Sequence, residues 1–241
     1  MPTQLYRLLR DESMAERLRS LKAILLGGAP VPALLLERAL ALELPLFTSY
    51  GCTEMASQVT TTAPGDPAEA LQTSGRLLPY RKLEIAGDGE ILLGGQTRCV
   101  GFLEKGELIH PFDAKGFWPS GDLGRLNDQG YLKIIGRKDN LFISGGENIY
   151  PEEIEQAMFE HPECEEVLVV PVPDPEFGQR PAAFVHSRRT IDPAEWRDFL
   201  SSRLAGFKIP RIYWPWPQEI PVGIKPSRQA FRELARTLLR E

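Results

Sequence analysis

The chain contains few of the residues that build metal sites and disulfide frameworks. Its 241 residues include three cysteines and three histidines. Cys52, Cys99 and Cys164 lie far apart and lack CxxC spacing, so they indicate neither a disulfide framework nor a zinc site and are expected to be free thiols. His161 and the other two histidines show no partner pattern, which argues against a role as metal ligands or catalytic bases.

Long apolar runs and basic stripes are also missing. No run approaches the ~20 apolar residues that a membrane-spanning helix needs, and the N-terminus has no hydrophobic signal core. No membrane span is therefore expected, and a cytoplasmic location follows. The net charge of -5 and the sequence pI of about 5.4 argue against nucleic acid as a partner.

A hydrophobic content of 42% is enough for one large or two modest domains. Residues 21–26 form an apolar segment that ends at Gly27-Gly28, residues 31–42 have the pattern of a helix, and residues 46–50 form a second apolar segment. This β-α-β alternation predicts a parallel sheet covered by helices. Ligands of such sheets bind beyond the carboxyl ends of the strands, where Gly27-Gly28 and residues 50–54 fall.

The pattern changes twice along the chain. Short alternating segments between residues 74 and 135 predict a small antiparallel barrel or curled sheet, with strands at 82–85, 90–93, 107–109 and 131–135. After residue 139 the helices and strands of a compact α+β unit are predicted at 151–160, 166–171, 182–186, 193–204, 211–214 and 226–239. The predicted fold is thus α/β plus α+β, divided into residues 1–73, 74–137 and 138–241.

The stretch from residue 136 to 155, GRKDNLFISGGENIYPEEIE, combines a charged turn, a glycine pair and a helix start. Gly145-Gly146 permits positive φ and the close approach of another molecule to the backbone. Pro151 suits the first helical position, and the glutamates after it suit the positive end of the helix dipole. On its own, the stretch also fits a surface hairpin followed by a well-capped helix.

Four further motifs occur with it: YGCTE at 50–54, WPSGD in a predicted turn at 118–122, LAGFKIP at 204–210 and GIK at 223–225. Together the five resemble, in order and spacing and over essentially the whole chain, the adenylate-forming enzymes, which include acyl-CoA synthetases, peptide-synthetase adenylation domains and luciferases. The resemblance implies that residues 1–137 correspond to the C-terminal part of a large AMP-binding domain. Residues 138–241 would then form a small mobile domain, with Asp139 as the hinge.

Adenylation requires a carboxylate to attack the α-phosphorus of ATP while pyrophosphate leaves, so negative charge must be neutralised on both sides of the breaking bond. The hydroxyl of Thr53 can donate to a phosphate, and Glu54 can hold Mg²⁺. The resemblance implies these roles and places other residues around the adenine and the nucleotide: Gly28, Ala29, Pro30, Tyr50 and Gly51. Without the other motifs, an ordinary helix start after a strand would be the preferred interpretation of Thr53-Glu54.

The ribose and the reacting phosphate need partners as well. Asp122 follows Gly121 in the predicted turn, and its carboxylate could accept hydrogen bonds from two neighbouring hydroxyls. The resemblance assigns it to the ribose, with Arg137 assisting; capping of a turn is the alternative. Lys225 is the expected adenylation catalyst, because a mobile ammonium can bridge the acid and the α-phosphate. Ile224 separates this lysine from Gly223, whereas the general family pattern places the lysine directly after glycine.

In the second half-reaction CoA thiolate attacks the acyl-adenylate and AMP leaves. The resemblance implies that the second domain rotates about Asp139, withdraws Lys225 and brings the segment Ser144-Gly145-Gly146 to the site. The missing side chains of the glycines suit a narrow passage for the pantetheine arm of CoA. ATP, Mg²⁺ and CoA are therefore the expected cofactors.

Residues 22–30, 141–149, 173–181 and 223–230 look most like the o-succinylbenzoate–CoA ligase branch, which acts in menaquinone biosynthesis. The Ser/Thr/Gly-rich phosphate loop of the family is absent, and residues 2–9 resemble the middle of such a ligase. We therefore expect that the chain alone ligates little or nothing. A homodimer is a further expectation from the family, although the sequence shows no interface.

Two alternatives to an o-succinylbenzoate ligase stay open. The first is a ligase for another aryl or fatty acid, because a fold does not define a substrate. The second is a catalytically silent module that binds nucleotide or CoA. The presence of both Glu54 and Lys225 argues against silence, since binding alone does not need them together. A soluble two-domain protein with chance motifs is the remaining, less specific interpretation.

Overall fold

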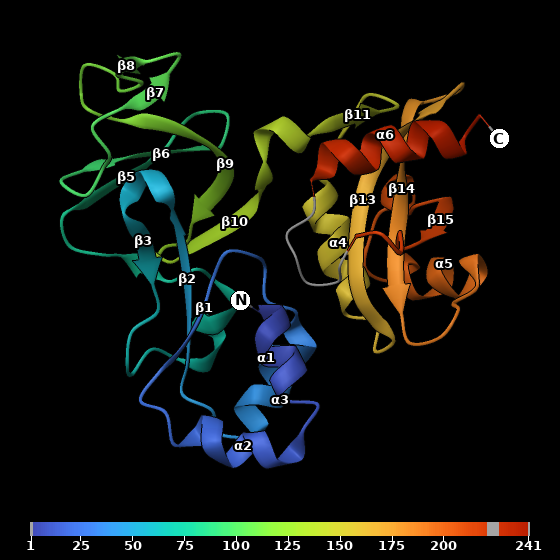
Figure 1. Ribbon diagram of the computed structural model, residues 1–241, viewed down its shortest axis with the longest axis horizontal. Helices are drawn as coiled ribbons and strands as arrows, with labels where there is room; N and C mark the ends of the chain where they lie inside the picture. The colour runs from blue at the N-terminus through green and yellow to red at the C-terminus, as the bar shows by residue number, and fades with distance from the viewer. Residues whose placement is uncertain (1, 221–226, 241) are drawn as a thin grey trace. The chain divides into compact units, whose positions relative to one another are not determined.

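The computed structural model describes residues 2–220 and 227–240. The chain divides into two compact units, Met1–Lys138 and Asp139–Glu241, drawn in blue to green and in yellow to red in Figure 1. Each unit has its own buried core. None of the helices in the described ranges is long and apolar enough to cross a lipid bilayer.

The first unit begins with helices packed around a short parallel strand pair. Its elements, in chain order, are α1 (Pro2–Leu8), α2 (Glu12–Arg19), β1 (Ile24–Leu26), α3 (Ala33–Ala41) and β2 (Leu46–Cys52). Asp11 caps α2 by accepting from the backbone N–H of Ser13. The strands β1 and β2 are parallel and joined through α3, as the β-α-β pattern predicts. The core between helices and strands is built mainly from leucines: Leu5, Leu9, Leu18, Leu26, Leu35, Leu36, Leu44 and Leu46.

The same sheet continues with antiparallel strands. β3 (Ser57–Thr61) pairs with β2, and β4 (Arg76–Leu77) pairs with β3, so the sheet order is β1-β2-β3-β4. The sequence pattern did not indicate β3, because its residues are mostly polar. The sheet is therefore mixed, with one parallel pair, and the expected all-parallel arrangement holds only for β1 and β2.

A second sheet of the first unit is antiparallel throughout, as the alternating segments predict. Its order is β10-β9-β6-β5, formed by β5 (Arg81–Ile85), β6 (Glu90–Gly95), β9 (Trp118–Leu126) and β10 (Leu132–Arg137). A separate hairpin joins β7 (Phe102–Glu104) to β8 (Glu107–Ile109). The interpretation of residues 118–122 as a turn is wrong, because these residues lie inside β9. Proline, serine and glycine are typical of turns, but Gly121 takes its positive φ of 73° within an irregular part of the ladder with β6.

The second unit is a three-stranded sheet with helices on both faces. Its elements are β11 (Phe142–Ser144), β12 (Glu147–Ile149), α4 (Pro151–Phe159), β13 (Cys164–Asp174), β14 (Gly178–Ser187), α5 (Pro193–Ser201), β15 (Ile212–Pro215) and α6 (Arg228–Leu238). β13 and β14 are antiparallel, and β15 is parallel to β14. The predicted helices and strands are confirmed, although β13 and β14 extend further at both ends than the apolar runs suggested.

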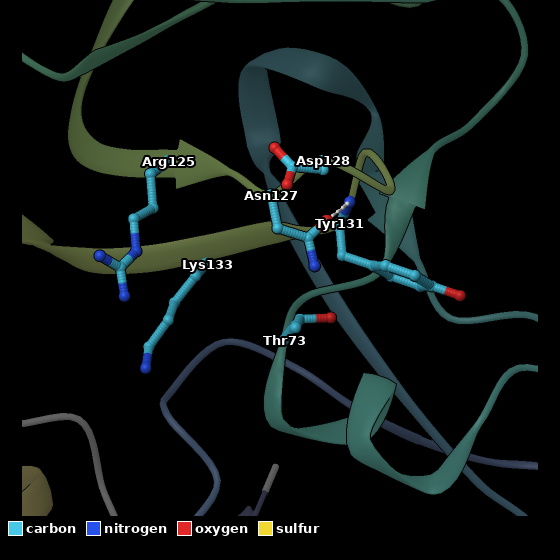
Figure 2. A pocket seen from close by; sticks show the side chains of 6 residues that line it. All are labelled: Thr73, Arg125, Asn127, Asp128, Tyr131 and Lys133. Carbon is cyan, nitrogen blue, oxygen red and sulfur yellow. Dashed lines mark hydrogen bonds between the residues drawn. The ribbon is translucent and has the colours of Figure 1, made fainter.

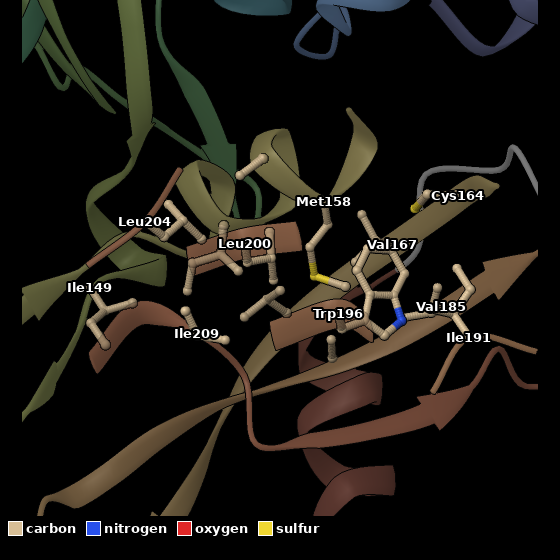
Figure 3. Packing of buried hydrophobic residues seen from close by; sticks show 14 of the residues in the cluster. Ile149, Met158, Cys164, Val167, Val185, Ile191, Trp196, Leu200, Leu204 and Ile209 are labelled. Carbon is tan, nitrogen blue, oxygen red and sulfur yellow. The ribbon is translucent and has the colours of Figure 1, made fainter. Parts of the chain in front are cut away.

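Both faces of this sheet are buried, which explains the near-continuous apolar run of β13. Val167 and Val169 belong to the core on one face, and Leu168 and Val170 to the core on the other, as the two-residue period of a strand requires. Figure 3 shows the first core, where the side chain of Met158 from α4 lies beside that of Trp196 from α5. The helix α6 covers the opposite face (Figure 1).

Candidate nucleotide site in the first unit and glycine turn in the second

The carboxyl end of β1 lies next to β2. The hydroxyl of Ser49 donates to the carbonyl of Leu26 at 3.3 Å, and a Cβ atom at Gly27 would lie 2.6 Å from Oγ of Ser49. Gly28 follows with a φ of 80°, so glycine is favoured here for close approach and for backbone conformation. The chain leaves the sheet through three exposed residues, Gly28, Ala29 and Pro30. They lie at the edge of the sheet where β2 reaches Tyr50.

Tyr50 contacts Asp122 directly. The phenol donates to Oδ2 of Asp122 at 2.6 Å, across 72 positions of the sequence. Burial raises the pKa of Tyr50, and the negative charge of Asp122 raises it further. The phenol therefore stays protonated and donates to the carboxylate at neutral pH.

The other carboxylate oxygen of Asp122 faces Arg137. Nη1 of Arg137 lies 3.2 Å from Oδ1 of Asp122 and also donates to the carbonyl of Ser120 at 3.2 Å. Asp122 and Arg137 are cross-strand partners in the β9–β10 ladder. A Cβ atom at Gly121 would lie 2.9 Å from Nη2 of Arg137. Glycine at position 121 thus leaves room for the guanidinium that neutralises Asp122.

A layer of polar contacts supports the backbone of residues 120–122. The hydroxyl of Ser120 donates to the carbonyl of Ile91 at 2.8 Å and accepts from the N–H of Asp122 at 3.1 Å. The N–H of Gly121 donates to Oε1 of Glu90 at 3.1 Å. Nζ of Lys138 donates to the second oxygen of Glu90 at 2.7 Å. Sequence reasoning missed the roles of Ser120, Glu90 and Lys138; for Ser120, the quoted WPSGD motif was the available signal.

Thr53 and Glu54 form a single 3₁₀ turn, Thr53–Met55, directly after β2. Gly51 lies within β2 rather than in a turn: a Cβ atom there would lie 1.9 Å from the carbonyl oxygen of Ser57, so only glycine fits between β2 and β3. Burial raises the pKa of the Cys52 thiol to about 12, and the adjacent carboxylate of Glu54 raises it as well. Thr53 is exposed and Glu54 half-buried.

The backbone after this turn is strained. Ala56 has a φ of 53° and Ser57 a φ of 95°, in the region that non-glycine residues rarely adopt. Such conformations cost on the order of 1–3 kcal/mol each and concentrate at functional sites. The sequence carries no signal for this strain, because neither residue type favours positive φ.

The carboxylate of Glu54 suits a cation that binds together with the phosphates of a nucleotide. Within the described part of the chain, no group of three or more His, Cys, Asp or Glu residues could hold a metal ion. Mg²⁺ is commonly bound by one or two carboxylates together with substrate phosphates and water. A single carboxylate at the end of β2 therefore suits Mg²⁺·nucleotide and does not make a free-standing metal site.

A shallow pocket of about 410 Å³ lies toward the other end of the β9–β10 hairpin. Figure 2 shows the six side chains that line it: Thr73, Arg125, Asn127, Asp128, Tyr131 and Lys133. Arg125 and Lys133 are cross-strand partners there, whereas Asp122 pairs with Arg137 further along the same ladder. None of the residues expected to bind nucleotide lines this pocket.

The glycine turn of the second unit joins β11 to β12. Gly145 has a φ of 58° and Gly146 a φ of 88°, which defines a two-residue hairpin turn with positive φ at both central positions. The side chain of Ser144 is buried before the turn. Asp139 is exposed in the 3₁₀ turn Lys138–Asn140. Lys225 lies outside the described residues.

The structure thus brings Tyr50, Asp122 and Arg137 into direct contact and leaves Gly28 to Pro30 and Thr53-Glu54 at the ends of the neighbouring strands β1 and β2. This combination of a strand-end glycine pair, a half-buried carboxylate and a guanidinium is suited to a ribose and its phosphate. The family model "AMP-binding enzyme" matches residues 1–108, and the model "AMP-binding enzyme C-terminal domain" matches residues 153–221. The chain belongs to the AMP-binding enzymes, the class of the adenylate-forming ligases.

Two similar relatives share one name. The chain is 39% identical to the 2-succinylbenzoate–CoA ligase of Escherichia coli (strain K12), with 97% of this chain and 49% of the relative covered. It is 36% identical to the corresponding ligase of Listeria monocytogenes serotype 4b, with 92% and 46% covered. The chain spans about half the length of the curated relatives it matches.

Solved structures give the same result. An Escherichia coli MenE variant with bound OSB-AMS superposes with a TM-score of 0.82 at 39% identity, over 97% of this chain and 49% of that chain. The o-succinylbenzoate CoA synthetase of Bacillus subtilis, in complex with the acyl-adenylate intermediate OSB-AMP, superposes with a TM-score of 0.78 at 34% identity, over 89% and 46%.

Proposed function

We propose that the chain acts in an ATP-dependent ligase that joins o-succinylbenzoate to CoA. The reaction converts o-succinylbenzoate, ATP and CoA to o-succinylbenzoyl-CoA, AMP and pyrophosphate through an acyl-adenylate. The observation that carries the proposal is the contact of Asp122 with both Tyr50 and Arg137, in a chain whose relatives are named as this ligase.

In the adenylation step, a carboxylate oxygen of the acid attacks the α-phosphorus and pyrophosphate departs. Asp122 would accept hydrogen bonds from the ribose hydroxyls, while Arg137 stays paired with its other carboxylate oxygen. The hydrogen bond to Asp122 fixes the ring of Tyr50, so one face of the ring would be held for the adenine. The exposed backbone at Gly28, Ala29 and Pro30 would line the same pocket.

Four further residues would act at the phosphates. Thr53 and Gly51 would lie against the nucleotide, with the Thr53 hydroxyl donating to a phosphate oxygen. Glu54 would hold Mg²⁺, which neutralises phosphate charge when it is bound. Lys225 would bridge the attacking carboxylate and the α-phosphate as charge develops.

In the thioester step, the CoA thiolate attacks the acyl carbonyl and the C–O bond to AMP breaks. Residues 138–241 would move as a domain about Asp139 and present Ser144, Gly145 and Gly146 to the pantetheine arm. Glycine at the turn leaves the backbone uncovered, which a narrow passage requires. The cytoplasmic location and the homodimer expected from the family remain parts of this proposal.

The nucleotide role of Asp122 can be tested by binding an acyl-sulfamoyl adenosine that carries the o-succinylbenzoyl group. Asp122→Asn is expected to weaken binding at least about 10-fold, since a charged hydrogen-bond partner is worth about 1.5–3 kcal/mol. Asp66→Asn is the matched control, because Asp66 also accepts from a tyrosine, Tyr131 at 2.8 Å, and pairs with an arginine, Arg76 at 2.6 Å. Equal affinities of the two variants would count against the proposed site.

The acid can be identified in the source organism. Disruption of the gene is expected to cause accumulation of o-succinylbenzoate and loss of its CoA thioester, measured by mass spectrometry of cell extracts. Accumulation of another aryl or fatty acid would favour the alternative ligase. Unchanged acid and thioester pools, together with tight binding of the adenosine analogue, would favour a silent nucleotide-binding module.

A further inference from the structure

The two glycines of the β11–β12 turn differ in their surroundings. A Cβ atom at Gly145 would lie 2.5 Å from Cδ1 and 3.2 Å from Cε1 of Phe177, whereas a Cβ atom at Gly146 would have no atom of the described residues within 4 Å. The N–H of Gly145 also donates to the carbonyl of Phe177 at 2.9 Å. One side of the turn is therefore packed against Phe177, and the other side is open.

Phe177 itself is fixed by the loop that joins β13 to β14. Its N–H donates to Oδ1 of Asp174 at 2.8 Å, and the guanidinium of Arg180 lies 3.7 Å from the centre of its ring. Arg180 is buried, with 6% of its surface exposed, and its Nε lies 2.8 Å from Oδ2 of Asp174. Asp174 thus connects the backbone of Phe177 with the cation that stacks on the Phe177 ring.

This arrangement holds the turn more firmly than a hairpin of two three-residue strands could hold it alone. Short two-stranded hairpins are marginally stable in water, yet the packed side of Gly145 is defined by an aromatic ring, a main-chain hydrogen bond and an ion pair whose guanidinium is buried. The ring lies on the face of Gly145 and not over Gly146. The contacts therefore fix the position of the backbone without covering its open side.

We propose that Phe177 is a positioning residue for the thioester-forming step, because it sets the place of the Gly145-Gly146 backbone along which the thiol arm of CoA passes. The inference rests on the proposed function, in which this turn borders the pantetheine passage. Displacement of a positioning element by about 1 Å can cost up to about 100-fold in rate. Phe177 would have no part in adenylation, which uses the other unit and Lys225.

Hydrogen exchange of the 241-residue chain tests the positioning directly. Phe177→Ala is expected to speed exchange of the Gly145 amide by about 10-fold or more, because the turn loses its packed side. The matched control is Phe199→Ala, since Phe199 is a partly buried ring of the same unit with the guanidinium of Arg203 stacked at 3.9 Å. Equal exchange of Gly145 in wild type and Phe177→Ala would overturn the proposal.

The two half-reactions, measured separately, test the assignment to one step. Phe177→Ala is expected to slow thioester formation from preformed acyl-adenylate about 10-fold, to leave pyrophosphate exchange within about twofold of wild type, and to recover in Phe177→Tyr. An equal loss in both half-reactions, or the same split in Phe199→Ala, would overturn it. A wild-type chain that catalyses neither step would agree with the low activity expected of the chain alone, and the exchange experiment would then decide whether Phe177 holds the turn.

Discussion

The phenol of Tyr50 donates a 2.6 Å hydrogen bond to Asp122, and the two residues belong to different sheets of the first unit. Tyr50 lies on β2, beside the parallel strand pair, whereas Asp122 lies on β9 of the antiparallel sheet. The bond therefore joins the two sheets at the point where both carry residues expected to bind nucleotide. A change at either residue should affect stability as well as binding.

Tyr50→Phe is expected to reduce the free energy of unfolding by about 1.5 kcal/mol at neutral pH, the value of a hydrogen bond to a charged group. It should also change the alkaline limb of the stability profile. Burial raises the pKa of Tyr50 in the folded state, so its contribution is complete below about pH 10 and is lost as the pH rises further. Urea unfolding between pH 8 and 11 should thus show a shallower decline in the variant than in wild type.

Tyr80→Phe provides the control for this experiment. Tyr80 exposes 69% of its surface, so removal of its hydroxyl should leave both the neutral stability and the alkaline decline near those of wild type. An alkaline decline of Tyr50→Phe as steep as that of wild type would contradict the buried phenol at position 50.

Gly121→Ala is expected to weaken adenosine binding more than it weakens folding. The φ of 73° costs an alanine about 1–2 kcal/mol, and the new methyl group would lie 2.9 Å from Nη2 of Arg137 and push the guanidinium away from Asp122. Gly89→Ala is matched in backbone, with a φ of 86°, but a methyl group there meets no atom within 4 Å. Calorimetric titration with AMP should separate the variants, whose folding costs should be similar; equal AMP affinities would refute the steric argument.

The sequence predicted much of the fold because its signals were local. Apolar runs marked β1, β2 and β13, and proline with acidic residues marked the start of α4. The positions of the site residues along the chain followed from motifs that the family shares. Local patterns did not mark every element, because the helix α2, capped by Asp11, was not predicted.

What the sequence could not predict depends on contacts between distant residues. The Tyr50–Asp122 bond spans 72 positions, and its geometry arises only when two sheets meet. The prediction of a turn at residues 118–122 was wrong for a related reason. Hydrogen bonding to β6 and β10 holds the Pro-Ser-Gly segment within strand β9. Phe177 lies in the segment 173–181, which carries part of the family resemblance, yet its contact with Gly145 is visible only in the folded unit.

Arg228 is expected to be the most important charge for the stability of the second unit. At the start of α6 its guanidinium pairs with both oxygens of Glu155, at 2.6 and 3.1 Å, and lies 3.5 Å from Glu152. All three side chains are at most 16% exposed. Arg228→Ala removes the cation from two mostly buried carboxylates, whose other donors, Asn140 and the N–H of Val169, carry no charge. It should therefore cost about 3–5 kcal/mol.

The loss in Arg228→Ala should depend on pH. Burial raises the pKa of Glu152, and the charge of Arg228 opposes this shift. Without the arginine, Glu152 protonates more readily, so the stability deficit should shrink as the pH falls from 8 toward 5. Arg203→Ala, which breaks an ion pair with Glu160 that is 35% exposed on each side, should cost at most about 1 kcal/mol. Unfolding followed by tryptophan fluorescence reports mainly on this unit, which contains three of the four tryptophans, Trp196, Trp214 and Trp216. Equal losses in the two variants would contradict the buried network.

Gly145→Ala and Gly146→Ala should differ in stability although both place alanine at positive φ. In each variant the positive φ of the alanine lowers the free energy of unfolding by about 1–2 kcal/mol. Only the methyl group at 145 would also collide with the ring of Phe177, at 2.5 Å. Gly145→Ala should therefore be the more destabilising change in urea unfolding. In a Phe177→Ala background the collision disappears, so the cost of Gly145→Ala should fall to that of Gly146→Ala. This double-mutant cycle isolates the contact between the two residues, and strictly additive costs would mean that Phe177 does not define the packed side of the turn.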